Sequence, residues 1–204
     1  MIMPLTMPLS EIFAFSAFVW IGSFTPGPNT AIAATTGVNY GLRASMPHVA
    51  GVPLGFVALM WLLGMGGSVI LQDQPTLLIA MKIAGNSYLL YLAWKLCFAS
   101  QLSTGSNLKP FTLIQSVMFQ LVNPKAWMML VAVTSNYAIG HENYIARLSW
   151  MSLGIALPSA LSLFSWAWAG EKLRHWLVVG NRLRIFNICM GVSLACTAVW
   201  MFQQ

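Results

Sequence analysis

Long charge-poor stretches, separated by short polar segments, make up most of the sequence. Six such stretches fall at about residues 9–38, 45–71, 76–98, 111–139, 148–170 and 185–202. Each reaches or exceeds the ~17–25 residues that an α-helix needs to cross a bilayer. Because membrane-spanning helices are apolar nearly all round, this assignment rests on length and flanking charge, not on an amphipathic period. The pattern predicts an all-α integral membrane protein with six transmembrane helices.

The first and fourth stretches differ from the others, because proline interrupts each of them near its middle. The interruptions read FTPGPN at residues 24–29 and LVNPKA at residues 121–126. A proline inside a helix removes a hydrogen bond and costs ~3 kcal/mol or more, and lipid supplies no water for the freed backbone groups. Interrupted segments at corresponding places in two halves are typical of a transporter's binding site.

Each broken stretch opens a set of three spans, which divides the chain into two halves. Half one covers about residues 1–100 and half two about residues 108–204. Three is an odd number, so we expect the halves to cross the membrane in opposite orientations, as inverted repeats do. The polar segments are too short to hold a second domain. We therefore predict a single transmembrane domain over residues 1–204.

The residues at each break predict that a helix starts again inside the membrane. Thr25-Pro26 and Asn123-Pro124 each resemble an N-cap followed by proline at the first helical position. Such helix starts direct free N–H groups and the positive end of the helix dipole into the membrane interior. Two of them close together would form a site for an anion.

Lys125 stands directly after the second break, near the predicted bilayer centre. A lysine at this depth costs at least ~3 kcal/mol unless it faces a partner or water. The four acidic residues all lie near span ends, so we expect a substrate carboxylate to be the partner of Lys125. A purely structural turn at residues 25–29, or a lysine that reaches the interface, remains the alternative for either motif taken alone.

Composition supports the membrane assignment and excludes a nucleic-acid-binding protein. The 204 residues are 58% hydrophobic and 7% charged, whereas soluble domains average about 25% charged. The net charge is +6, but the basic residues are scattered or sit at the ends of apolar stretches. This arrangement indicates contact with membrane lipid, and we expect no nucleic-acid partner.

Basic residues accumulate on one side of the predicted membrane. Loops two and four, with their flanks, carry only Lys82 and Arg147. Loops one, three and five carry seven basic residues: Arg43, Lys95, Lys109, Lys172, Arg174, Arg182 and Arg184. The positive-inside rule places the basic loops in the cytoplasm. We therefore predict that both termini lie outside it.

Other chemistry is sparse. The three cysteines form no CxxC pair, the three histidines are dispersed, and no HExxH or GxSxG motif occurs, so we predict neither an enzyme nor a metal or other cofactor. An intramembrane electron carrier remains the alternative, and it would need a cysteine pair. His48, at the start of the second span, is a candidate proton relay, because histidine changes charge near neutral pH. An interfacial histidine without such a role is the other interpretation.

The motifs TPGPN and NPKA resemble the signatures of the LysE/RhtB family of amino-acid exporters, and AGVPLG (residues 50–55) and KIAGNSYLLYLAWK (residues 82–95) fit the same pattern. The resemblance covers essentially the whole chain. It implies a six-helix protein of the bacterial inner membrane that exports amino acids or close derivatives, driven by the proton gradient. YLAWK and SWAWAG (residues 165–170) are also similar to the branch that exports cysteine and O-acetylserine.

Carried over by motif, the resemblance implies a set of candidate substrate-binding residues. They are Thr25, Pro26, Gly27, Pro28, Asn29, Asn123, Pro124 and Lys125. Asn86 joins this set as a departure, because family members often have a small apolar residue at that position. The sequence identifies neither the particular amino acid nor the coupling ion, and it leaves open whether the protein forms a homo-oligomer.

Overall fold

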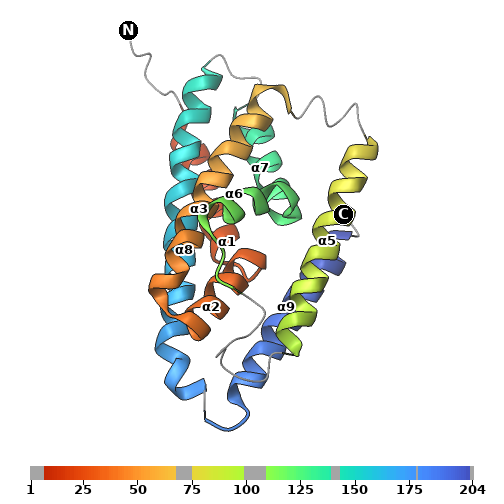
Figure 1. Ribbon diagram of the computed structural model, residues 1–204. Coiled ribbons are helices and arrows are strands. Elements are labelled where there is room, and N and C mark those ends of the chain that lie inside the picture. Colours follow the sequence, from red (N-terminus) through yellow and green to blue (C-terminus); the bar gives the residue numbers. More distant parts are fainter. Residues whose placement is uncertain (1–6, 68–74, 99–108, 139–142, 178, 203–204) are drawn as a thin grey trace.

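The chain is helical throughout the part that the structure, a computed structural model, describes: residues 7–67, 75–98, 109–138, 143–177 and 179–202 (Figure 1). The elements in order are α1 (Leu9–Phe24), α2 (Pro28–Tyr40), α3 (Leu42–Leu62), the π-helical turn η1 (Leu63–Gly67), α5 (Pro75–Cys97), α6 (Leu113–Val122), α7 (Pro124–Val133), a second π-helical turn η2 (Thr134–Ala138), α8 (Tyr144–Leu177) and α9 (Arg182–Phe202). No strand occurs in these ranges, which confirms the predicted fold class of an all-α protein.

Three to five of these helices qualify as membrane spans in the described ranges. Three single helices are long and apolar enough, at Leu42–Gly66, Tyr144–Leu177 and Arg182–Val199. Two bent pairs qualify if each is counted as one span: α1 with α2, bent by 46°, and α6 with α7 and η2, bent by 72°. These pairs are the two predicted broken stretches. Helix α5 matches the predicted third span with 23 residues but is not among the five, so the sixth span stays a prediction.

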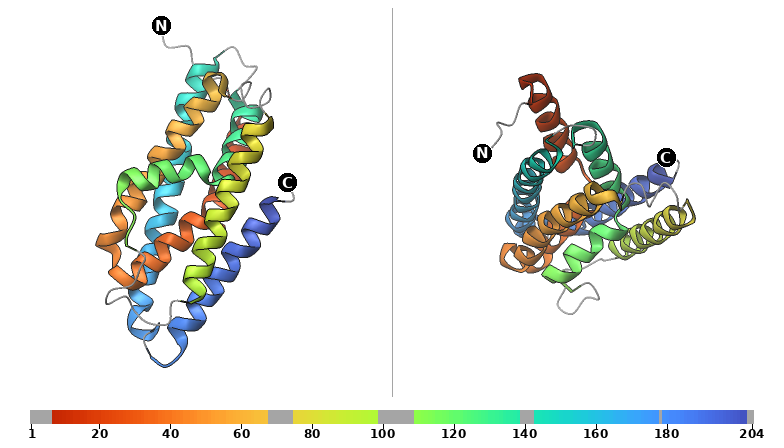
Figure 2. Two further views of the ribbon diagram at one scale, coloured as in Figure 1. Left: turned by 45° about the vertical axis from the view of Figure 1, so that its right-hand side comes forward. Right: turned by 90° about the horizontal axis from the view of Figure 1, so that it is seen from above.

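Helices from the two predicted halves pack against each other. Helix α3 lies along α8 and α6, α2 lies along α8, and α5 pairs with α9 (Figures 1 and 2). The α2–α8 contact is close because both helices offer glycine. A Cβ at Gly37 would lie 2.1 Å from the Ala167 carbonyl oxygen, and one at Gly170 would lie 2.3 Å from that of Ala34. Small residues of this kind let two helices pack closely. Close packing matters in a bilayer because the hydrophobic effect does not favour association of helices that are already surrounded by lipid.

The glycines that the sequence places four apart in AGVPLG serve the α3–α6 contact. A Cβ at Gly51 would lie 2.6 Å from Cβ of Ser116, and one at Gly55 would lie 2.6 Å from Cγ of Gln120. Both positions therefore require glycine for space. The consequence for the site is that the start of α3, including His48, is held directly against α6.

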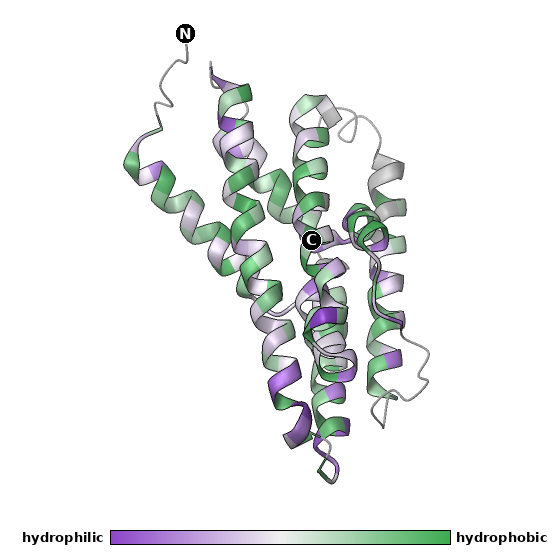
Figure 3. Ribbon diagram, turned by 60° about the vertical axis from the view of Figure 1, so that its left-hand side comes forward, coloured by the Kyte–Doolittle hydropathy of each residue, from purple (hydrophilic) through white to green (hydrophobic). Residues whose placement is uncertain are grey.

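Large apolar side chains cover the outside of the bundle as well as its interior. Phe13, Ile114 and Leu153 are each more than 70% exposed, which suits contact with lipid chains better than contact with water. Hydrophilic residues are concentrated toward the end of the bundle where α8 joins α9 (Figure 3). At that end, Gly41 takes a left-handed φ of 85° before α3, and the Leu42 N–H donates to Oε1 of Glu171 on α8 over 3.1 Å.

Candidate functional site

The first break separates α1 from α2 at two successive X-Pro pairs. Thr25 (ψ 131°) and Gly27 (φ −178°, ψ −171°) are both extended, because a following proline disfavours helical backbone. The Thr25 hydroxyl donates to the Ile21 carbonyl over 2.6 Å, which ends α1. The prediction of an N-cap at Thr25 with Pro26 as the first helical residue is wrong. The second proline, Pro28, opens α2, and Gly27 is the N-cap.

The second break follows the prediction more closely. Asn123 is the N-cap of α7 and Pro124 is its first residue. The Asn123 side chain does not cap the helix, and its Nδ2 donates to Oε1 of Gln120 over 3.2 Å. Its buried Oδ1 has no hydrogen-bond partner within the described part of the chain. An unpaired buried acceptor is unfavourable by ~1–3 kcal/mol, so this oxygen is ready to accept from a ligand.

Lys125 connects the two breaks. Its Nζ donates to the carbonyl oxygen of Thr25 over 2.8 Å and lies 3.5 Å from that of Pro26. These carbonyls lie at the C-terminal end of α1, the negative end of its dipole. Lys125 is also the second residue of α7, where the positive end of that helix disfavours a cation. Since an ammonium has three donors, one N–H remains for an anion.

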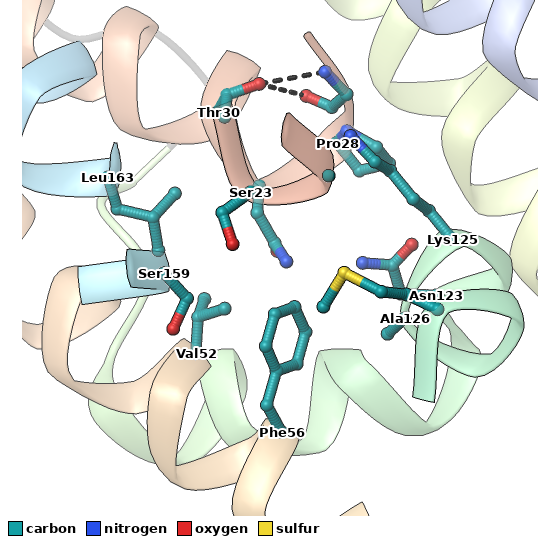
Figure 4. A pocket seen from close by; sticks show the side chains of 14 residues that line it. Ser23, Pro28, Thr30, Val52, Phe56, Asn123, Lys125, Ala126, Ser159 and Leu163 are labelled. Atoms are coloured by element: carbon teal, nitrogen blue, oxygen red, sulfur yellow. Dashed lines mark hydrogen bonds between the residues drawn. The ribbon is translucent and has the colours of Figure 1, made fainter. Parts of the chain in front are cut away.

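Both helix starts line one pocket (Figure 4). The space between its side chains is about 390 Å³ when the part open to the surroundings is included. The described lining residues are Gly22, Ser23, Gly27, Pro28, Asn29, Thr30, Val52, Phe56, Asn123, Lys125, Ala126, Met129, Ser159 and Leu163. Lys125 is the one charged side chain in this set, so the pocket is electropositive.

Amide side chains join the two breaks behind the pocket. Asn29 Nδ2 donates to Gln120 Oε1 over 2.9 Å, and Gln120 Nε2 lies 3.3 Å from Asn29 Oδ1. Gln120 Nε2 also donates to the Ser116 carbonyl over 2.8 Å, and Gln120 Oε1 accepts from Asn123. Gln120 is fully buried. The first turn of α2 is thereby fixed to the end of α6.

The candidate residues from the sequence fall into three groups. Gly27, Pro28, Asn29, Asn123 and Lys125 line the pocket. Thr25 and Pro26 are outside the lining, although their carbonyls face Lys125.

Pro124, Asn86 and His48 are also outside the lining. Pro124 is buried against α5, where a Cβ added at Gly85 would lie 3.0 Å from its ring. Asn86 is 4% exposed, and neither its Nδ2 nor its Oδ1 has a partner among the described residues. His48 lies behind Asn29, whose carbonyl oxygen is 3.2 Å from its Nε2.

Several residues near the pocket were not predicted. Ser116 and Gln120 have a signal in the sequence, because with Asn123 they follow the spacing i, i+4, i+7 and so share one face of a mostly apolar segment. Ser23 and Ser159 have no such pattern. Ser23 Oγ is buried without a hydrogen-bond partner in the described chain, and it lines the pocket opposite Lys125 (Figure 4).

A partly buried ion pair lies on the far side of the core from the basic turns. Arg147 on α8 donates to Oε1 of Glu11 on α1 over 2.7 Å and to the Tyr137 carbonyl over 3.0 Å. Arg147 is 7% exposed. The sequence indicates two charges near span ends and does not show that they meet. The pair joins α1, η2 and α8 at a distance from the pocket, since none of its members lines it.

Comparison with known proteins places these features in a family. Residues 20–203 match the family model of the LysE type translocator. The chain is 29% identical over 191 residues to the cysteine/O-acetylserine efflux proteins of Escherichia coli (strain K12) and Shigella sonnei (strain Ss046), which covers 93% of this chain and 96% of each relative. No solved structure matches the chain.

The family match spans both breaks, the pocket and every helix after α1. It confirms the resemblance drawn from TPGPN and NPKA, and the family consists of transporters, not enzymes. The chain belongs to the LysE type translocator family and is a multi-pass membrane protein.

Proposed function

We propose that this protein exports amino acids or close derivatives across the bacterial inner membrane, driven by the proton gradient. One observation carries the proposal: Lys125, the one charged residue among the described lining, stands where two half-helices begin at a common pocket. Helix N-termini and an ammonium both favour an anion. The relatives named as cysteine/O-acetylserine efflux proteins support a substrate that carries an α-carboxylate.

The carboxylate of the substrate binds the third N–H of Lys125 and the N–H groups in the first turns of α2 and α7. The first turn of a helix leaves backbone N–H groups without i−4 partners. In α7 the Ala126 N–H already donates to the Asn123 carbonyl over 3.0 Å, so the backbone N–H of Lys125 is the group available there. Pro28 and Pro124 at the first positions fix both starts. Binding at this point also balances the unfavourable position of Lys125 at the start of α7. The free carboxylate is thus the main recognised group.

The α-ammonium of the substrate binds the unpaired oxygens of the same pocket. Asn123 Oδ1 and Ser23 Oγ are buried, lack partners among the described residues, and belong to residues that line the pocket. Both can accept from an ammonium, and both become satisfied only when the ligand is bound. The side chain of the substrate then meets the apolar wall formed by Val52, Phe56 and Leu163, which favours a small, weakly polar group.

The architecture that we propose for this activity has six spans in two inverted halves with both termini outside the cytoplasm. Helix α5 supplies the sixth span, since its 23 residues are enough to cross a bilayer of ~30 Å. The two bent helix pairs open the two halves. The turns at residues 41 and 179–181, with their basic neighbours, then face the cytoplasm.

The experiment compares Lys125→Met and Lys125→Arg with the wild type. Membrane abundance of Lys125→Met should equal or exceed that of the wild type, because removing an intramembrane charge eases insertion. Its binding of labelled L-cysteine and O-acetyl-L-serine in detergent, and efflux of both from cells, should be lost. Lys125→Arg should keep partial activity, since arginine retains the charge but not the compact geometry.

The matched control is Lys172→Met, which removes an exposed lysine from the end of α8. It should bind and export as the wild type does. Carboxyl-amidated and N-acetylated analogues should compete poorly with the free amino acids. Binding of the free acid by Lys125→Met at wild-type affinity would rule out the carboxylate site.

A further inference from the structure

His48 is fully enclosed beside the pocket and makes two polar contacts. It is 1% exposed on α3. Its Nδ1 lies 2.9 Å from Ser116 Oγ on α6, and its Nε2 lies 3.2 Å from the carbonyl oxygen of Asn29 on α2. The ring of Phe111 packs edge-on against the imidazole at 5.6 Å between centroids. The polar partners of the His48 ring are therefore the Ser116 hydroxyl and the Asn29 carbonyl.

The contacts of the neutral imidazole compete for one hydrogen. A carbonyl oxygen only accepts, so the contact with Asn29 requires a proton on Nε2. Nδ1 is then an acceptor, and the Ser116 hydroxyl has to donate to it. The same hydroxyl oxygen lies 2.9 Å from the Thr112 carbonyl oxygen, which also only accepts. With one hydrogen, Ser116 can satisfy Nδ1 or Thr112 but not both.

The protonated imidazolium satisfies every contact at once. Nε2–H donates to the Asn29 carbonyl, Nδ1–H donates to Ser116 Oγ, and the Ser116 hydroxyl donates to the Thr112 carbonyl. The change from neutral to charged needs only a rotation of the Ser116 O–H bond, and all heavy atoms stay in place. Nδ1 of neutral His48 is therefore an acceptor that can bind a proton without any movement of the surrounding heavy atoms.

Asn29 links this proton position to the pocket. Its carbonyl accepts from His48, its side chain pairs with Gln120, and Asn29 itself lines the pocket in the first turn of α2. Gln120 in turn holds Asn123. Protonation at Nδ1 makes Nε2–H a charged donor, so its hydrogen bond to the Asn29 carbonyl becomes stronger. Through Asn29 and Gln120 this change reaches both helix starts that face the substrate.

Three charged side chains on neighbouring elements make their contacts with groups other than His48. Glu171 on α8 accepts from the Leu42 N–H at the start of α3, and Lys125 on α7 bonds the carbonyls of the first break. Lys109 precedes Phe111 by two residues and lines a second pocket beside α2, α5 and α9. None of these three is among the hydrogen-bond and ring partners that the structure gives to His48.

We propose that His48 binds the proton that drives transport, and that Asn29 couples this proton to the substrate pocket. The step is the binding of a proton to Nδ1 and its later release to the other side, with no other bond made or broken. Ser116 is a positioning residue, which accepts from Nδ1–H. The inference rests on the proposed export activity and assigns its coupling group.

The test uses purified full-length protein in liposomes with a pH-sensitive dye trapped inside. In the wild type, an acidic lumen should drive uptake of labelled L-cysteine, and adding L-cysteine should make the lumen more alkaline. His48→Gln keeps an N–H donor for the Asn29 carbonyl but cannot titrate. It should lose both responses to the level of empty liposomes and still exchange labelled for unlabelled L-cysteine when no pH gradient is applied.

The matched control is His175→Gln, which makes the same substitution at an exposed histidine near the end of α8 and should behave as the wild type. Ser116→Ala keeps Cβ and removes the acceptor for Nδ1–H. The pH of half-maximal gradient-driven uptake should move lower by about one to two units, as expected for the loss of a hydrogen bond to a charged group. This variant also tests the idea if His48→Gln fails to insert.

Gradient-driven uptake by His48→Gln at the wild-type rate would overturn the assignment, and so would an unshifted pH profile for Ser116→Ala. The proposed export function fails in a different way. In that case the wild type itself would exchange none of the amino acids offered, with or without a pH gradient.

Discussion

Gly27→Ala tests the geometry at the first break, because Gly27 lies directly against Lys125. A Cβ added at Gly27 would lie 3.0 Å from both Cδ and Nζ of Lys125. Carbon contacts are ordinarily about 3.5–4.0 Å, so the end of the lysine has to move by several tenths of an ångström. The backbone at Gly27 is extended and accepts alanine, which leaves the lysine as the group that yields.

The expected magnitude follows from the hydrogen bond that this movement disturbs. Lys125 Nζ lies 2.8 Å from the Thr25 carbonyl oxygen, and a hydrogen bond to a charged group contributes ~1.5–3 kcal/mol. If the displaced ammonium binds the substrate with about half of that contribution lost, the loss is ~0.75–1.5 kcal/mol, or about threefold to tenfold in affinity. We therefore expect Gly27→Ala to bind L-cysteine about threefold to tenfold more weakly. Its melting temperature should change little, because a flexible side-chain tip absorbs the contact.

The assay is equilibrium binding of labelled L-cysteine in detergent, together with thermal unfolding of the same samples. Gly37→Ala is the matched contrast, since its Cβ would lie 2.1 Å from the Ala167 carbonyl oxygen. That atom is backbone, so α2 and α8 have to separate, and overpacking of this kind costs about 1–3 kcal/mol. Wild-type affinity in Gly27→Ala, or a stability loss as large as that of Gly37→Ala, would refute the argument.

Three further predictions concern the architecture. A C-terminal reporter that is active only outside the cytoplasm should be active, and one that is active only inside should be silent; the reverse would overturn the orientation. Replacing Pro26 and Pro28 together by alanine should allow an unbroken helix and abolish L-cysteine efflux at near-normal membrane abundance, whereas normal efflux would make the break a packing feature. Arg147→Met should lower the free energy of unfolding by about 1–3 kcal/mol, because it removes the hydrogen bonds that the guanidinium donates to Glu11 and to the Tyr137 carbonyl. Glu11→Gln with Arg147→Met should recover part of that loss, and equal losses would argue against the pair.

The sequence predicts where the helices break, but at the first break it does not locate the first helical residue. One X-Pro pair defines a start without ambiguity, as at Asn123-Pro124. Two consecutive X-Pro pairs offer two starts, at Pro26 and Pro28. The choice depends on tertiary contacts: the Thr25 and Pro26 carbonyls are used by Lys125 from the other half of the chain. That contact spans a hundred residues and has no local signature.

The amide pair between Asn29 and Gln120 shows a second limit of the sequence. Each residue can be recognised as polar within an apolar segment, and Gln120 even shares a helix face with Asn123. Nothing in the local pattern says which helix that face meets, since apolar periodicity is lost in a span that is hydrophobic all round. The three-dimensional structure shows which helix this face meets. Gly51 and Gly55 of α3 pack directly against Ser116 and Gln120.

The position of Lys125 explains why the two breaks have to lie side by side. At the start of α7 alone, the lysine would oppose the dipole of its own helix, and lipid would offer no compensation. The C-terminal end of α1 supplies that compensation through two carbonyls, so each break stabilises the other through one side chain. In the proposed binding mode the substrate carboxylate takes the remaining N–H of the same ammonium. Recognition of the substrate and the contact between the two halves of the chain therefore depend on the same atom, Nζ of Lys125.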